Sequence, residues 1–318
     1  MRLIPEYEPI EKLQLCFVQE FFNERFQCGK TLCQMIRAAH PHAQVELFAS
    51  SADLPYLHRE FEQHHVDPQM LQVHCDSPGR IYLAESAPIF AECDDGETAG
   101  ILFSVPKLQQ AAEVEAFGRR LVNRLHVKPL EMNLPFRPAA LAVNEDVALL
   151  SQDAIKEEDR EATQAFFQEH FPRQTFNLVP SLAGDVTHDL DMFLWPIAPK
   201  VWIVSEYPDH TPQARSIAPA IEILLAHGHT VNRVPGLEPV IYADINTMPN
   251  YANGVILNHA ALVPVYGRQE DEVVQRILHN YGYEVLPVDC TDIILSNAAV
   301  HCLSKTVPAR SPAYGRTA

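Results

Sequence analysis

Cys302 is the residue best suited to covalent chemistry in this chain of 318 residues. It follows an apolar run that begins at Ile293 and ends in small residues, so we expect it at the end of a buried strand. A thiolate is a strong, soft nucleophile, but it needs an acid–base group and charged partners that the fold brings in from distant segments. Polar residues in unusual apolar settings, His188 among them, are the first candidates for that role.

The segment 184–196 supplies the most unusual of these polar residues. It places His188, Asp189 and Asp191 directly before an apolar stretch that begins at Met192. A histidine among carboxylates usually lies in a surface loop. Here the apolar residues that begin at Met192 follow the carboxylates directly, which indicates that the carboxylates adjoin a buried strand. We therefore expect Asp191 to be partly buried, where it needs a cationic or hydrogen-bonding partner.

A second polar segment, residues 246–267, contains the dipeptide Asn253-Gly254. This dipeptide is typical of tight turns, so the segment predicts a polar loop that leads into a hairpin. Together with the strand that ends at Cys302, three polar loops would lie at strand ends. A shared central site is assembled from loops placed in this way.

The acidic composition limits the partners. The net charge is -17, from 24 Lys and Arg against 41 Asp and Glu, and the basic residues form no run, so nucleic acid and anionic membranes are poor partners. The negative field of such a protein would attract a cationic substrate, although the need for solubility alone also explains the negative net charge. Charges in residues 1–8 argue against a signal peptide, and no segment approaches the ~18 apolar residues of a membrane span. We expect a cytoplasmic protein.

Cysteine and histidine usage points away from disulfides and metal. The seven cysteines contain no Cys-x-x-Cys pair, and the 15 histidines show no metal-ligand spacing. We expect reduced thiols, most of them small core residues, and no metal site. His64-His65 fits a surface pair at a helix end.

A repeated unit gives the main clue to architecture. In residues 223–235 and again in 277–288, an amphipathic helix ends at a glycine, Gly228 or Gly282, and passes directly into a short strand. Looser copies occupy residues 33–48, 56–73, 113–134 and 161–179, and strand-like stretches occupy residues 81–90, 101–105, 193–205, 254–265 and 293–303. This pattern predicts about five α/β units around a centre. A doubly wound parallel sheet is the rival, but no Gly-rich phosphate-binding turn supports it.

Domain boundaries are few. No low-complexity linker interrupts the sequence, so we expect a single domain over residues 1–308. The small and polar residues 309–318 are expected to form a flexible tail.

Several segments, in order along the chain, resemble the agmatine deiminase and bacterial peptidylarginine deiminase family. They are Pro-Glu-Tyr-Glu-Pro at 5–9, the His/Asp segment before Met192-Phe193, Tyr-Ala-Asn-Gly-Val-Ile at 251–256, Val-Pro-Val-Tyr-Gly at 263–267, and His301-Cys302 followed by Pro308. The resemblance implies a pentein fold, which is a five-bladed α/β propeller with pseudo-fivefold repeats around a central active site. It also implies hydrolysis of a guanidinium C–N bond without metal or organic cofactor.

The resemblance also implies roles for individual residues. Cys302 would attack the guanidinium carbon, and His188 would act as acid and base. Asp191 and Glu85 would pair with the guanidinium nitrogens, with Asp189 and Asn253 as further substrate-binding residues. The substrate would be a small cationic guanidino compound, similar to agmatine or arginine.

Departures from the family pattern fall in the same loops. The family has Trp, Arg, Asp and Gly before its first conserved Pro, and this chain has Tyr82, Ala84, Glu85 and Ala87 in their places. The family's Glu-Gly-Gly-Asn stretch is missing. The glycines that the family has before His-Cys are replaced by Asn297, Ala298 and Ala299. His188 precedes Asp191 by three residues rather than two, so a regular strand would point them to opposite faces. Either a bulge at Asp189 restores His188 to the site, or the histidine is displaced. His301 is expected to have a supporting role.

Three functional hypotheses follow. The leading one is a cysteine-dependent deiminase, and an amidinotransferase differs from it only in whether an amine or water resolves the intermediate. A non-catalytic pentein that binds a protein is the hypothesis from another class. The sequence leaves open the particular guanidine and the oligomeric state, for which a homodimer is one option.

Overall fold

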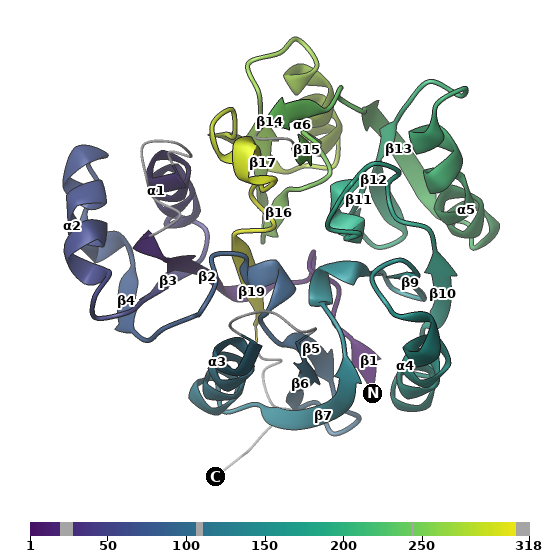
Figure 1. Ribbon diagram of the computed structural model, residues 1–318, viewed down its shortest axis with the longest axis horizontal. Coiled ribbons are helices and arrows are strands. Elements are labelled where there is room, and N and C mark those ends of the chain that lie inside the picture. Colours follow the sequence, from purple (N-terminus) through teal and green to yellow (C-terminus); the bar gives the residue numbers. More distant parts are fainter. Residues whose placement is uncertain (20–27, 106–110, 243–244, 310–318) are drawn as a thin grey trace.

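Five α/β units surround a common centre in the computed structural model, which describes residues 1–19, 28–105, 111–242 and 245–309 (Figure 1). Each unit repeats one pattern: two antiparallel strands, a helix, and a third strand parallel to the second. Parallel strands need such a crossover, and the helix provides it. Three units are β5 (Ile89–Glu92), β6 (Thr98–Ser104), α3 (Ala111–Arg124) and β7 (Lys128–Pro135); β8 (Leu141–Val143), β9 (Val147–Ser151), α4 (Glu157–His170) and β10 (Thr175–Val179); β11 (Leu194–Ala198), β12 (Val201–Glu206), α5 (Pro212–Ala226) and β13 (Thr230–Pro235).

The remaining two units lie at the two ends of the sequence. The last in sequence is β16 (Val255–Leu257), β17 (Ala260–Val265), α6 (Asp271–Asn280) and β18 (Glu284–Asp289). The first contains β2 (Ile10–Phe17), α1 (Cys28–Ala39), β3 (Gln44–Ala49), α2 (Leu54–Gln63) and β4 (Gln72–Cys75), and its antiparallel strand is β19 (Ser304–Pro308). The short β1 (Arg2–Leu3) pairs with β5, and β14 (Val240–Tyr242) pairs with β15 (Ile245–Thr247).

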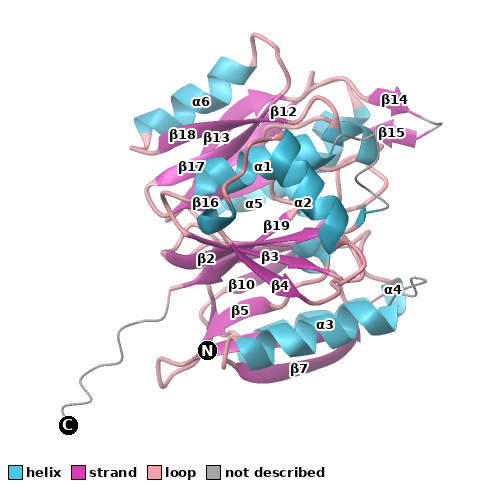
Figure 2. Cartoon of the chain, turned by 90° about the vertical axis from the view of Figure 1, so that its left-hand side faces the viewer, coloured by secondary structure: helices cyan, strands magenta, loops and turns pink. Residues whose placement is uncertain are grey.

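The predicted helix-to-strand transitions are confirmed. Gly228 and Gly282 have positive φ angles of 75° and 84°, which glycine adopts without steric penalty, and β13 and β18 start two residues later. The sheets are separate and contain two to four strands each. The doubly wound alternative is therefore wrong, because it requires one wide parallel sheet. In the perpendicular view, α3 runs beside β7 (Figure 2).

Two strand predictions were wrong. Residues 81–90 begin with the 3-10 helix η3 (Leu83–Glu85) before β5, and residues 293–303 form η6 (Ile293–Ser296) and turns. Asn297 interrupts the second stretch in the left-handed conformation, with φ 55°. Both stretches are apolar because they lie buried near the centre, and burial without alternation does not distinguish a strand from a buried turn.

Of the expected flexible tail at 309–318, Ala309 is described and its backbone N–H donates to the carbonyl of Pro9 at 2.8 Å, and residues 310–318 lie outside the described residues. No helix in the described ranges has the length and apolar character that crossing a membrane requires.

At the centre, three 3-10 helices lie together: η3, η4 (Pro138–Ala140) and η5 (Leu190–Met192).

Candidate active site

Cys302 lies in the turn immediately before β19, next to these central 3-10 helices. Its carbonyl accepts a hydrogen bond from the backbone of Ala84, which joins the turn to η3 (3.3 Å). The side chain is only 8% exposed. Its sulfur lies 3.6 Å from Oδ2 of Asp191, which belongs to η5. The fold therefore brings together two residues that are 111 positions apart in sequence.

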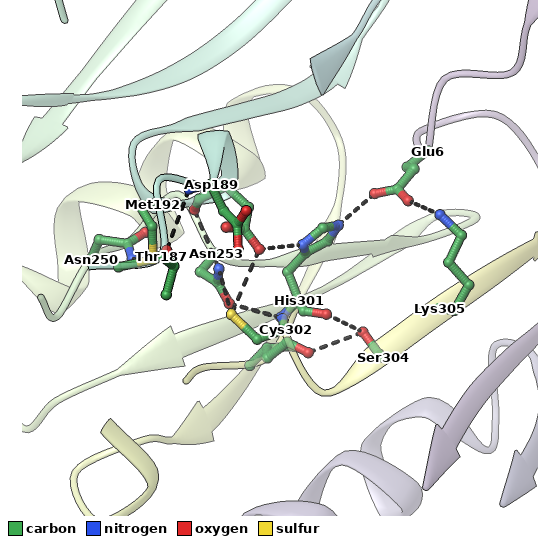
Figure 3. A network of polar contacts seen from close by, with 12 residues as sticks. Glu6, Thr187, Asp189, Met192, Asn250, Asn253, His301, Cys302, Ser304 and Lys305 are labelled. Atoms are coloured by element: carbon green, nitrogen blue, oxygen red, sulfur yellow. Dashed lines mark hydrogen bonds and ion pairs between the residues drawn. The ribbon is translucent and has the colours of Figure 1, made fainter. Parts of the chain in front are cut away.

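Asn253 holds the thiol in place. Its side-chain amide donates to the sulfur of Cys302 at 3.2 Å, and its side-chain oxygen accepts from the backbone N–H groups of His301 and Cys302 at 3.0 and 3.2 Å (Figure 3). The residue is fully buried. Asn253, a predicted substrate-binding residue, therefore also fixes the position of the candidate nucleophile Cys302.

Gly254 fixes Asn253 through a close approach to Trp195. A Cβ atom added to Gly254 would lie 2.3 Å from the ring of Trp195, so only glycine lets the backbone pass there. The predicted polar loop that leads into a hairpin is confirmed, because residues 248–254 run directly into the antiparallel pair β16 and β17, although the tight turn itself is not at Asn253-Gly254. The β16–β17 hairpin turns instead at Asn258, which adopts the left-handed conformation with φ 59°.

A chain of charged groups leads away from the thiol. Lys305 donates to Glu6 at 2.7 Å, Glu6 pairs with Nε2 of His301 at 2.7 Å, and Nδ1 of His301 pairs with Oδ2 of Asp191 at 2.8 Å (Figure 3). Burial opposes the charged imidazole, but Glu6 and Asp191 outweigh it and raise the pKa of His301 to about 10. His301 is therefore an imidazolium at neutral pH, and it holds Asp191 in one orientation. We predicted a supporting role for His301, and its bond to Asp191, a candidate catalytic carboxylate, fits that role.

One oxygen of Asp191 has no partner. Oδ2 faces both His301 and Cys302, whereas Oδ1 is buried and makes no hydrogen bond within the described residues. A buried acceptor of this kind is costly unless something donates to it. A ligand with N–H donors would satisfy it.

The thiol of Cys302 is neutral at rest. Burial raises its pKa well above the ordinary value, and the charge of Asp191 raises it further. A thiol in this setting is a poor nucleophile until a nearby positive charge offsets both effects.

His188 contacts Asp185 and Ser181. Its φ is 61°, its backbone N–H donates to Asp185 at 2.7 Å, and its Nδ1 lies 3.1 Å from the hydroxyl of Ser181. Of the contacts recorded for the described part of the chain, none joins His188 to Cys302 or Asp191. The chain takes a left-handed residue at 188 and then enters η5, so no strand with a bulge is present to bring the imidazole to the sulfur.

Glu85 and Asp189 are already paired with arginines. Arg80 lies 3.1 Å from Glu85, and Arg137 lies 3.0 Å from Asp189. Burial raises the pKa of both carboxyl groups, although the neighbouring arginines oppose the shift. Sequence reasoning missed Arg137. A signal was present, because a cation between Phe136 and an apolar Pro-Ala-Ala stretch needs a buried carboxylate.

A hollow that is open to solvent borders this row of charged residues. Glu6, His301 and Asp191 contribute to its lining, and Phe90 and Trp195 are among its apolar wall residues. Asp191 thus reaches the thiol on one side and the hollow on the other.

The family model described as Porphyromonas-type peptidyl-arginine deiminase matches residues 2–308. The chain belongs to this family. Its members are hydrolases that act on C–N bonds of linear amidines, so the family predicted from the ordered sequence segments is confirmed, and the deiminase class with it. Among the curated proteins, none has a matching sequence.

Solved structures show the same fold at low identity. The C. jejuni agmatine deiminase is 17% identical with a TM-score of 0.84, covering 97% of this chain and 96% of that one. A Cys-to-Ser variant of that enzyme with substrate bound gives the same values. The agmatine deiminase of Enterococcus faecalis is 15% identical with a TM-score of 0.78, covering 98% and 96%. The fold is therefore the mixed α/β fold of pentein-type deiminases.

Proposed function

We propose that this protein hydrolyses a C–N bond of a guanidino compound through a covalent intermediate on Cys302, within a single domain over residues 1–308 whose five units close into a propeller. One observation carries the proposal. The neutral thiol, held by Asn253, faces Asp191, whose second oxygen is buried and has no hydrogen-bond partner among the described residues. A guanidinium group supplies the two things that are missing, N–H donors for Asp191 and a positive charge beside the sulfur.

The first half of the reaction forms the intermediate. Two guanidinium N–H groups donate to Asp191, and the cation lowers the pKa of the thiol. The sulfur proton passes to Asp191 Oδ2 as the sulfur bonds to the guanidinium carbon, which gives a neutral tetrahedral adduct. Asp191 returns the proton to one amino group, the C–N bond breaks, and ammonia leaves a thiouronium cation on Cys302.

The second half releases the product. Water gives a proton to Asp191 and adds to the thiouronium carbon. The C–S bond then breaks, and a ureido product leaves. Cys302 regains one proton and ammonia takes the other, so one guanidinium and one water yield one ureido compound and one ammonium ion.

This scheme assigns the acid–base role expected of His188 to Asp191, because Asp191 is the carboxylate within reach of the sulfur. His301 positions Asp191 through the bond between Nδ1 and Oδ2. Two ion pairs set the charge around Asp191: Arg80 with Glu85, and Arg137 with Asp189. The solved C. jejuni enzyme is titled an agmatine deiminase, which together with the acidic charge of this chain supports an agmatine-like or arginine-like substrate.

The test is a panel assay with matched variants. The protein is incubated with agmatine, arginine and a peptide ending in arginine, and both ammonia and ureido product are measured. We expect both products in equal amounts from at least one compound, loss of both in Cys302→Ala, and full activity in Cys75→Ser, because Cys75 is exposed and remote in the fold. Turnover that survives Cys302→Ala would overturn the mechanism, and no turnover of any guanidine would overturn the function.

A further inference from the structure

A cluster of two histidines and a glutamate lies outside the candidate active site. Nδ1 of His42 and Nε2 of His259 lie 3.3 Å apart, and Nε2 of His42 lies 3.9 Å from Oε2 of Glu284. One ligand atom from each of the three residues can be chosen so that all lie within 4.8 Å of one another. Two imidazoles and one carboxylate form a common ligand set for divalent zinc.

The distances suit such an ion. Zinc binds imidazole nitrogen at about 2.0–2.1 Å in a tetrahedral arrangement, which places two ligand atoms about 3.3 Å apart. The two imidazole nitrogens already have this separation. Glu284 contacts Nε2 of His42, whereas the nitrogen of His42 that faces His259 is Nδ1, so the glutamate side chain must rotate towards Nδ1 to become the third ligand. Glu284 is exposed and free to make this rotation, which leaves the fourth position for water.

The backbone holds the three residues together without a metal. Asn258, in the left-handed turn before His259, accepts from the backbone of Ile10 at 2.9 Å and donates to the carbonyl of His42 at 2.9 Å. The backbone N–H of Glu284 donates to the carbonyl of His259 at 2.9 Å. A ligand set on segments fixed in this way needs little reorganisation to bind an ion.

The cluster joins the two units at the ends of the sequence. His42 precedes β3 of the first unit, His259 lies in the β16–β17 turn of the last, and Glu284 begins β18. We propose that His42, His259 and Glu284 bind one divalent transition-metal ion, with zinc as the best match, and that the ion clamps the first unit to the last. The site is separate from Cys302 and does not depend on the proposed reaction.

Zinc titration of the full chain tests this proposal. After EDTA treatment and dialysis, we expect calorimetry to show one tight zinc site per chain, and the melting temperature to rise by a few degrees at about a hundred times the dissociation constant. Magnesium, which prefers oxygen ligands, should give neither effect. His259→Ala and Glu284→Gln change exposed side chains, so they should fold and weaken binding at least tenfold. His58→Ala, on exposed helix α2, is the matched control and should bind as the wild type does.

Cobalt substitution separates this site from the cysteines. Cobalt bound by imidazole and carboxylate lacks the thiolate-to-metal charge-transfer absorption that cysteine ligands produce. A spectrum dominated by that absorption would overturn the proposal, as would unchanged zinc affinity in both His259→Ala and Glu284→Gln. Loss of the tight site in these variants, with a cobalt spectrum free of thiolate bands, is the supporting result.

Discussion

A cationic ligand should acidify Cys302 strongly, and two small alkylating agents can measure how strongly. Chloroacetamidine carries an amidinium group, and chloroacetamide carries a neutral amide at the same position. An amidinium bonded to Asp191 would lie about 4 Å from the sulfur, because Oδ2 itself is 3.6 Å away. At an effective dielectric constant of about 20, charges at that distance interact by about 4 kcal/mol.

This energy corresponds to a shift of about three pKa units, since one unit is about 1.4 kcal/mol. A bound amidinium should therefore raise the thiolate fraction of Cys302 by about a thousandfold at neutral pH. Exposed Cys75 serves as the internal reference, because it reports the intrinsic reactivity of the two reagents. The expected ratio of chloroacetamidine to chloroacetamide rates is about a hundred to a thousand times larger at Cys302 than at Cys75.

Mass spectrometry of both cysteine peptides from one digest gives the two ratios under identical conditions. Asp191→Asn removes the anion that binds the amidinium, so it should abolish most of the excess at Cys302 while leaving Cys75 unchanged. Equal ratios at the two cysteines in the wild type would refute the electrostatic reasoning. An excess that persists in Asp191→Asn would show that another group, such as Glu85, binds the cation.

Three other predictions follow from the same geometry. Because burial raises the pKa of Cys302 well above 9, its alkylation by neutral chloroacetamide should still rise about tenfold per pH unit as the solution passes pH 9, and a plateau below that pH would contradict the shift. Glu6 and Asp191 raise the pKa of His301 from 6.5 to about 10. The wild type should therefore be more stable than His301→Gln by its full margin below pH 6.5, and this margin should disappear as the pH rises through 10. Melting curves of both proteins across this range measure how the margin changes with pH. Gly254→Ala forces a Cβ into Trp195 and should destabilise the fold by at least about 1–3 kcal/mol and lower the activity, whereas Gly118→Ala in α3 meets only ordinary contacts and should stabilise it by about 0.5–1 kcal/mol. Equal denaturation midpoints for these two glycine variants would exclude the close-approach argument.

Much of the fold was predictable because its signals are local. The helix-to-strand transitions at Gly228 and Gly282 combine an amphipathic period, a left-handed glycine and a short strand within about a dozen residues. The burial of Cys302 and of Asp191 was also predictable. Each stands beside an apolar stretch that implies burial.

The partners of the site were harder to predict because they depend on tertiary contacts. Nothing local indicates that His301 reaches Glu6, which is 295 residues away, or that Arg137 pairs with Asp189. The position of His188 depended on whether its segment formed a strand, and the left-handed backbone there was not evident from the residue types. The cluster around His42 escaped detection for a similar reason, since its members come from three distant segments.

The pairing of β19 with β2 has a consequence for the order of folding. The first unit lacks its antiparallel strand until residues 304–308 have been synthesised, so the edge of β2 stays unpaired while most of the chain emerges. Cys302 and His301 directly precede that last strand and reach Asn253 and Asp191 only when it docks. Cys302 is thus placed in one of the final steps of folding, and a nascent chain arrested before residue 304 should have no deiminase activity.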